Sequence, residues 1–127
     1  MTATDALRDA IDERFLPRTN VLLDIHAERE LQDAKFPEQH DLPDGTGGEH
    51  SRSTANMARA QCNDAHTGKS LTWKHILREE YAEAMAETEP ALLRAELVQV
   101  AAVAVKWIEW IDKRPAMIKA ELAKLPA

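Results

Sequence analysis

The chain has 127 residues, of which 44% are apolar and 30% are charged, and this length and composition predict one globular domain over residues 1–127 and exclude a disordered tail. Its 16 lysine and arginine residues are outnumbered by 22 aspartate and glutamate residues, which gives a net charge of −6 at pH 7. A chain of that charge repels a phosphate backbone, so we expect no binding to long nucleic acid.

The cysteine content and the apolar stretches restrict the class of protein further. Cys62 is the only cysteine, so the chain can form neither an internal disulfide nor a thiolate zinc site by itself. The most apolar stretch, residues 97–105, is too short to cross a bilayer, and no leader sequence is recognisable at the start. We therefore expect a cytoplasmic protein that does not insert into membranes.

Alanine, leucine, glutamate and lysine dominate the sequence, and no segment alternates convincingly between apolar and polar residues, so we predict an all-α fold. Pro17 and Pro37 should interrupt helices, and Gly68 should end one in the left-handed conformation. Pro90 suits a first helical turn, and Pro115 should separate a short tail helix from the rest. In chain order, the predicted helices cover about 4–15, 19–35, 54–66, 72–87, 88–114 and 116–124.

Residues 36–53 separate the second predicted helix from the third. This segment holds two prolines, three glycines and several histidine, aspartate and serine residues, a composition that favours turns over helix. We predict a single long loop here. In so small a domain, a loop of this length is usually functional or disordered.

Acidic residues continue an apolar row on the predicted helix at 72–87. Residues three or four apart share a helical face, so the expected buried row contains Trp73, Ile76, Leu77, Tyr81 and Ala84. Glu80 and Glu83 follow Ile76 at steps of four and three, and Glu79 lies beside them. These carboxylates therefore lie at the edge of the apolar face, although a solvated acidic face is the commoner arrangement for helical glutamates.

The predicted helix at 88–114 is apolar almost all round between Leu97 and Ile111, which is typical of a helix in a core or an oligomer interface. Glu96 falls in its inward row, one turn before Gln99. An unpaired buried carboxylate costs several kcal/mol, so it takes up a proton or meets a cation. Oxygen ligands favour Mg²⁺ or Mn²⁺ over zinc. A structural alternative pairs Glu96 with the cations Arg78, Arg94 or Lys106.

The pattern Glu80-x-x-Glu83, twelve residues, then Glu96-x-x-Gln99 resembles the E-x-x-E … E-x-x-D signature of the MazG-like all-α nucleoside triphosphate pyrophosphohydrolases. Glu79 also matches the Glu-Glu-x-x-Glu form of the motif. The segment 28–40, ERELQDAKFPEQH, and PDG at 43–45 are similar to short MazG-like proteins of phages and actinobacteria. The resemblance covers about residues 20–113 and implies a bundle with a four-helix core. It departs from the family at Gln99, where aspartate is usual, and at Phe36-Pro37, where glycine would follow the aromatic residue.

The resemblance implies hydrolysis of a nucleoside or deoxynucleoside triphosphate and water to the monophosphate and pyrophosphate. It implies that Glu80, Glu83, Glu96 and Gln99 hold Mg²⁺, or Mn²⁺, and that Glu79 positions the attacking water. Because a triphosphate is strongly anionic, an acidic site can accept it only if metal ions reverse the local charge. Gln99 leaves the set one negative charge short, so we expect weaker metal binding.

Further candidate residues lie at the end of the second predicted helix. Glu28, Gln32 and Lys35 continue the row of Ile25 at helical spacing towards the loop. In a substrate site, Lys35 would meet a phosphate, Gln32 a base edge, and Phe36 or Trp73 would stack on the base. The equally simple alternative is a helix that emerges into solvent.

The apolar helix at 88–114 also favours self-association, and MazG-like cores form dimers or tetramers, so we expect a homodimer or homotetramer. Two other functions stay open for this sequence. One is a catalytically weakened relative that binds nucleotides or serves in assembly, because Gln99 replaces an acid. The other is a helical interaction domain whose glutamates form salt bridges.

Overall fold

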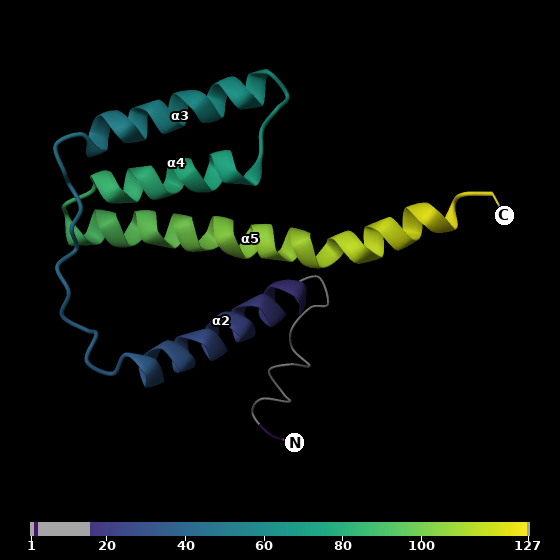
Figure 1. Ribbon diagram of the computed structural model, residues 1–127, viewed down its shortest axis with the longest axis horizontal. Coiled ribbons are helices and arrows are strands. Elements are labelled where there is room, and N and C mark those ends of the chain that lie inside the picture. The colour runs from purple at the N-terminus through teal and green to yellow at the C-terminus, as the bar shows by residue number, and fades with distance from the viewer. Residues whose placement is uncertain (1, 3–15, 127) are drawn as a thin grey trace. The chain divides into compact units, whose positions relative to one another are not determined.

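A computed structural model describes Thr2 and residues 16–126 of the chain (Figure 1). Its described residues contain no strand and form four α-helices: α2 (Leu16–Lys35), α3 (Ser51–Thr67), α4 (Trp73–Ala86) and α5 (Pro90–Ala123). The prediction of an all-α fold is confirmed. The predicted helix at 4–15 lies outside the described residues.

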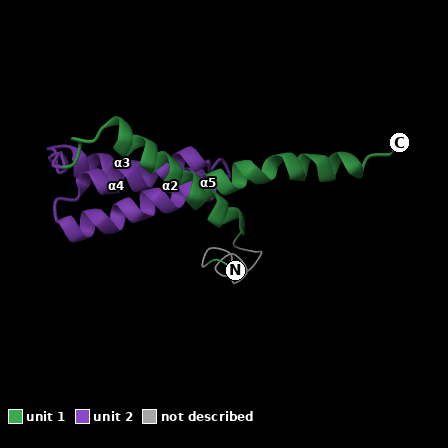
Figure 2. Ribbon diagram, turned by 90° about the horizontal axis from the view of Figure 1, so that it is seen from below, with its two compact units in different colours: residues 1–40, 108–127 green, residues 41–107 purple. Residues whose placement is uncertain are grey.

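The chain divides into two compact units, which Figure 2 shows in different colours. One unit consists of residues 1–40 and 108–127, and it contains α2 and the C-terminal part of α5. The other consists of residues 41–107, and it contains α3, α4 and the N-terminal part of α5. All the carboxylates of the MazG-like motif belong to the unit 41–107.

Small side chains form the contact between α3 and α4. The buried residues of α3 are Ala55, Ala58, Cys62 and Ala65, which recur at steps of three and four and so share one face. Ala55 and Ala58 form a buried cluster with Ala82 of α4, and Ala86 packs against it. Because these side chains are short, the two helix backbones lie close together, and the polar residues that flank the stripe are brought into range of one another.

The end of α3 differs from the prediction in one residue. Gly68 has a φ of −80°, and Lys69, with a φ of 58°, takes the left-handed conformation that was predicted for Gly68. The reason is the hydrogen-bond pattern of the turn: the Ser70 N–H donates to the carbonyl of Ala65, and the Lys69 N–H donates to that of His66. The helix therefore closes one residue later than the position of the glycine indicates.

Helix α4 begins with a capping box. The hydroxyl of Thr72 accepts a hydrogen bond from the backbone N–H of His75, and Nδ1 of His75 accepts one from the backbone N–H of Thr72. The helix ends at Ala86, one residue before its predicted end, because Glu87 takes an extended conformation. The carboxylates of Glu79, Glu80 and Glu83 therefore lie between the capping box and the end of α4.

Helix α5 begins at Pro90, two residues after its predicted start at 88, and the prediction that Pro90 lies in the first turn is confirmed. It then continues through Pro115 to Ala123, so the predicted separate tail helix at 116–124 is wrong. Pro115 removes one backbone hydrogen bond, but the apolar spacing of Ile111, Ile118 and Leu122 places these residues on one side of the helix across that gap. The 34-residue helix therefore absorbs the proline locally.

The segment between α2 and α3 is irregular, but it ends at His50 instead of residue 53, because α3 begins at Ser51. The hydroxyls of Ser51 and Ser53 donate to the carbonyls of Gly48 and His50, respectively, which favours an earlier helix start than the composition predicted. The N–H of Gly47 donates to the carbonyl of Met85 at 2.8 Å. This bond attaches the segment to the end of α4.

In the unit of residues 1–40 and 108–127, α2 begins at Leu16, three residues before its predicted start. Pro17 therefore lies in its first turn, where a missing N–H costs little. Val21 is buried, and the Nε of Arg18 donates to the Glu109 carboxylate of α5 at 3.0 Å. At the end of the same unit, a pocket of about 440 Å³ has an almost entirely apolar lining: Met117, Ile118, Glu121, Leu122 and Leu125.

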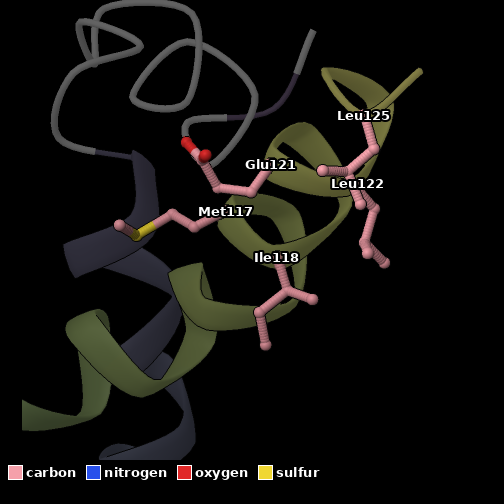
Figure 3. A pocket seen from close by; sticks show the side chains of 5 residues that line it. All are labelled: Met117, Ile118, Glu121, Leu122 and Leu125. Carbon is pink, nitrogen blue, oxygen red and sulfur yellow. The ribbon is translucent and has the colours of Figure 1, made fainter.

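Most apolar side chains of α5 are open to solvent. Figure 3 shows Ile118, Leu122 and Leu125 of the pocket projecting from one side of the helix. Leu93 is the buried residue of α5, whereas Leu97 is 46% exposed and Val98 is 52% exposed. Burial of this helix all round within one chain is therefore wrong. Within the described residues, no helix has the length and apolar character needed to cross a membrane.

Candidate functional site

Three of the predicted carboxylates lie on one half-buried face of α4. Glu79, Glu80 and Glu83 are all partly shielded from solvent, whereas Tyr81, which was predicted in the buried row, is 56% exposed. The reason is helical rotation: Tyr81 is two residues from Glu79 and from Glu83, which turns it about 200° away from both. The acidic face of α4 is therefore a partly buried face, and Tyr81 projects from the opposite side.

Glu80 lies at the electrostatic centre of this face. Burial raises the pKa of its carboxyl, and the neighbouring carboxylates of Glu79, Glu96 and Glu83 raise it further, in that order. Glu96 comes from α5, so the structure brings the two halves of the sequence motif into electrostatic range. The raised pKa therefore reflects first the burial of Glu80 and then the negative charge around it.

Arg59 of α3 provides the nearest positive charge. Its Nε donates to Oε1 of Glu83 at 3.0 Å, and its NH2 group forms a very short ion pair with the same oxygen. Hydrogen bonding and charge attraction by Glu83 raise the pKa of the Arg59 guanidinium, and Glu79 and Glu96 contribute smaller attractions. Since the Glu83 side chain is only 19% exposed, the pair is partly desolvated on its acidic side.

Cys62 lies on the same side of α3 and is 8% exposed. Burial raises the pKa of its thiol to about 11, and a hydrogen bond with Glu79 and the charges of Glu79 and Glu80 act in the same direction. The thiol is therefore protonated at neutral pH. Cys62 is a free cysteine, and a buried, protonated thiol is a poor nucleophile.

The second half of the motif consists of Glu96 and Gln99 on α5, of which only Glu96 is partly shielded from solvent. Glu96 is half-buried and forms no ion pair with a described residue, so the predicted pairs with Arg78, Arg94 or Lys106 are not present there. Gln99 is exposed. Within residues 16–126, no three histidine, cysteine, aspartate or glutamate side chains already have the arrangement of a metal site.

The candidate substrate residues fall in different units. Glu28, Gln32, Lys35 and Phe36 belong to the unit of residues 1–40 and 108–127, where all four are exposed. The NH1 group of Arg29 donates to the Gln32 side chain at 3.1 Å, and Lys35 Nζ lies 5.3 Å from the centroid of the Phe36 ring.

Trp73 belongs to the unit 41–107 and is half-buried at the start of α4. Lys106 Nζ of α5 lies 5.9 Å from the centroid of its ring, which is within the range of a cation–π contact. The Trp73 ring is thus already engaged by a cation of this chain.

Arg59 and Cys62 are the members of the site that sequence reasoning missed. The available signal was the stripe of Ala55, Ala58, Cys62 and Ala65, because small residues at helical spacing mark a close contact with another helix. Arg59 follows Ala58 directly and so lies at the edge of that contact. The stripe does not show which helix is the partner, and therefore not that the cation meets Glu83.

No family model, no curated protein and no solved structure matches this chain significantly. The resemblance to MazG-like proteins therefore rests on the sequence motif alone.

Proposed function

We propose that this protein is a Mg²⁺-dependent nucleoside triphosphate pyrophosphohydrolase of the MazG-like type, acting on the cytoplasmic nucleotide pool. It would convert a nucleoside or deoxynucleoside triphosphate and water into the monophosphate and pyrophosphate. The observation that carries the proposal is the half-buried face of α4 on which Glu79, Glu80 and Glu83 lie, with Glu96 of α5 within electrostatic range of Glu80. A half-buried site with such an excess of carboxylate oxygens favours a hard divalent cation.

The donor set fits such a cation in its chemistry. Glu80, Glu83 and Glu96 supply oxygen ligands from two helices, and Gln99 is one turn further along α5. Mg²⁺ bound there would neutralise phosphate charge and lower the pKa of a coordinated water. Mn²⁺ has the same preference for oxygen and would replace it.

The other side chains of the cluster have roles that follow from their contacts. Glu79 lies close enough to Cys62 for its charge to raise the pKa of the thiol, and its carboxylate has lone pairs that can accept a proton from water. Arg59 holds Glu83 in the absence of a cation. If Glu83 held a cation instead, the guanidinium of Arg59 would be free to donate to a phosphate oxygen.

The test is pyrophosphate release from a panel of canonical and modified deoxynucleoside triphosphates in the presence of Mg²⁺ or Mn²⁺. Glu83→Gln should abolish release, and Gln99→Asp should preserve or raise it. Glu49→Gln, on an exposed residue without an ion pair in the described chain, serves as the matched control and should retain the parent rate. Absence of turnover with every substrate, or an unchanged rate in Glu83→Gln, would refute the proposal.

A second function is favoured by the Arg59–Glu83 ion pair and by the exposure of Gln99. In this alternative the chain binds nucleotides with Mg²⁺ but does not hydrolyse them, because one ligand is held by arginine and another is a neutral amide. Calorimetric titration with a non-hydrolysable triphosphate separates the two functions. Binding without pyrophosphate release supports the second one, and thermal stability that is unaffected by Mg²⁺ and nucleotide excludes both.

We also propose that the protein assembles as a homodimer or homotetramer through α5. The support is the exposure of its large apolar residues, among them Leu97 and Val98. Light scattering after size-exclusion chromatography measures the mass directly. A monomer at micromolar concentration would contradict this part of the proposal.

A further inference from the structure

A groove of about 450 Å³ lies between α4 and α5, inside the unit 41–107. Its lining surface is apolar, and two basic residues contribute the apolar parts of their side chains to it: the lining residues are Lys74, Leu77, Arg78, Tyr81, Val100 and Trp107. The volume falls within the range of about 300–1,000 Å³ that is typical of sites for small molecules. The groove is therefore large enough for a compact ligand.

The groove is centred on the side of α4 opposite Glu79 and Glu83. Tyr81 is two residues from each of these carboxylates, which turns it about 200° from both around the helix. The four α4 residues of the groove lie within two turns of one face. Leu77 is one turn from Glu80, and Val100 of α5 is one turn from Glu96, so the groove adjoins the carboxylate cluster, although the proposed hydrolysis uses none of the groove's own residues.

Positive charge marks one end of the groove. Lys74 and Arg78 are four residues apart, so their Cβ atoms are about 5–6 Å from each other. Both side chains are exposed, and neither forms an ion pair with any residue that the structure describes. Two adjacent unpaired cations match a group with two negative charges, such as a phosphate monoester.

Aromatic and aliphatic surfaces complete the groove. Leu77 and Val100 form apolar surface between the helices, and Tyr81 presents a ring that is 56% exposed. Trp107 lies near the start of α4, at the same end of the groove as Lys74, since its neighbour Lys106 is placed over the Trp73 ring. An exposed ring beside an apolar floor favours stacking of a planar ring.

We propose that this groove is a second, non-catalytic binding site for a planar ring attached to a phosphate monoester, the chemistry of a nucleoside monophosphate. The ring stacks on Tyr81 over Leu77 and Val100, and Lys74 and Arg78 bind the phosphate. The carboxylate cluster cannot substitute for this site in the absence of metal, because its excess negative charge repels a phosphate.

The experiment is isothermal titration calorimetry of the full chain with adenosine 5′-monophosphate in buffer containing EDTA. Adenosine and ribose 5-phosphate are the two partial ligands, and each should bind at least tenfold more weakly than the monophosphate. Arg78→Gln should weaken binding about tenfold, the effect of losing a hydrogen-bonded charge, and Tyr81→Ala about fivefold or more. Both residues are exposed, and circular dichroism verifies that the variants keep their helix content.

Arg94→Gln is the matched control, because Arg94 is an exposed arginine of α5 outside the groove, and its variant should bind like the parent. Glu83→Gln should also bind the monophosphate normally, even where it abolishes hydrolysis, so failure of this site and failure of the proposed enzyme are distinguishable. No saturable binding at millimolar monophosphate, equal binding of adenosine, or an Arg78→Gln variant that binds like the parent would each overturn the proposal.

Discussion

Gly47 connects the segment before α3 to the end of α4, and its substitution tests this attachment. Its N–H donates to the carbonyl of Met85 at 2.8 Å, and its φ of +78° lies in the left-handed region. A Cβ at this position would overlap the γ-methyl of Thr88, the residue between α4 and α5. We therefore predict that Gly47→Ala lowers the free energy of unfolding through two effects, backbone strain and steric overlap.

Substitutions at two neighbouring glycines, Gly45 and Gly48, separate the two effects. The left-handed conformation costs a residue with a side chain about 1–2 kcal/mol, and an added methyl group without space costs about 1–3 kcal/mol. Gly47→Ala should therefore lose about 2–5 kcal/mol. Gly45 has a φ of +73° and open space around its Cβ position, so Gly45→Ala should lose only the strain, about 1–2 kcal/mol. Gly48 has neither problem, and Gly48→Ala should be neutral or stabilising by up to about 1 kcal/mol.

Urea denaturation followed by circular dichroism measures these losses. Thr88→Ser removes the γ-methyl group that a Cβ at residue 47 would overlap. The double variant Gly47→Ala/Thr88→Ser should therefore regain the stability lost to the overlap and keep only the loss caused by backbone strain, as in Gly45→Ala. A Gly47→Ala variant that is no less stable than Gly45→Ala, or one that Thr88→Ser fails to rescue, would refute the reasoning. Either result would mean that the segment does not contact Thr88 as the structure describes.

Ala58 is 2% exposed between α3 and α4, where a larger side chain has no room. Ala58→Leu should therefore lower the free energy of unfolding by about 1–3 kcal/mol in urea denaturation. An unchanged midpoint would contradict close packing of the two helices. Lys69 has a left-handed φ of 58°, so Lys69→Gly should stabilise the protein by up to about 1 kcal/mol, seen as a higher melting temperature, and a lower one would count against the strain. The pKa of Glu80 is raised above 4.5 by burial and by its acidic neighbours, so the folded state binds the proton more tightly than the unfolded chain, and stability falls as pH rises from 4.5 through the raised pKa. Glu80→Gln should therefore stabilise the metal-free protein at neutral pH and flatten this decline of stability with pH in thermal melts. The control variant Glu38→Gln, on an exposed residue, should do neither. Equal melting temperatures for Glu80→Gln and the parent would refute the coupling between Glu80 protonation and stability.

Helix boundaries were predictable where one residue decides them, and less so where the fold allows a choice. Pro90 acts through its fixed backbone at the start of α5, and Thr72 acts through its side chain at the start of α4. Both helix starts could therefore be predicted close to the observed residues. At Pro115 the lost hydrogen bond competes with an apolar row that continues on the same side of the helix, and the row prevails. At Gly68 the composition identified the turn, but the hydrogen bond of Ser70 to Ala65 selects Lys69 for the left-handed position.

The candidate site was predictable within each helix but not between helices. The spacing of Glu80, Glu83 and Glu96 on their own helices depends only on helical periodicity, and the structure places them in electrostatic range of one another. The contact of Arg59 with Glu83 depends on which face of α3 meets α4. That choice is made by the fit of small side chains across the interface, a non-local property that a single sequence does not display.

The net charge of the carboxylate cluster determines how protons and a divalent cation should compete for it. One nearby guanidinium, that of Arg59, attracts the carboxylates of Glu83, Glu79 and Glu96, and Glu80 adds a fourth carboxylate, so three negative charges are in excess when all four acids are ionised. Burial and the neighbouring carboxylates raise the pKa of Glu80, and protonation of Glu80 lowers that excess. A divalent cation achieves the same without a proton. Mg²⁺ binding should therefore release a proton from the cluster near the raised pKa of Glu80, and a Glu80→Gln variant should lose that release. Proton uptake on Mg²⁺ addition, measured with a pH indicator, would contradict a metal site at Glu80.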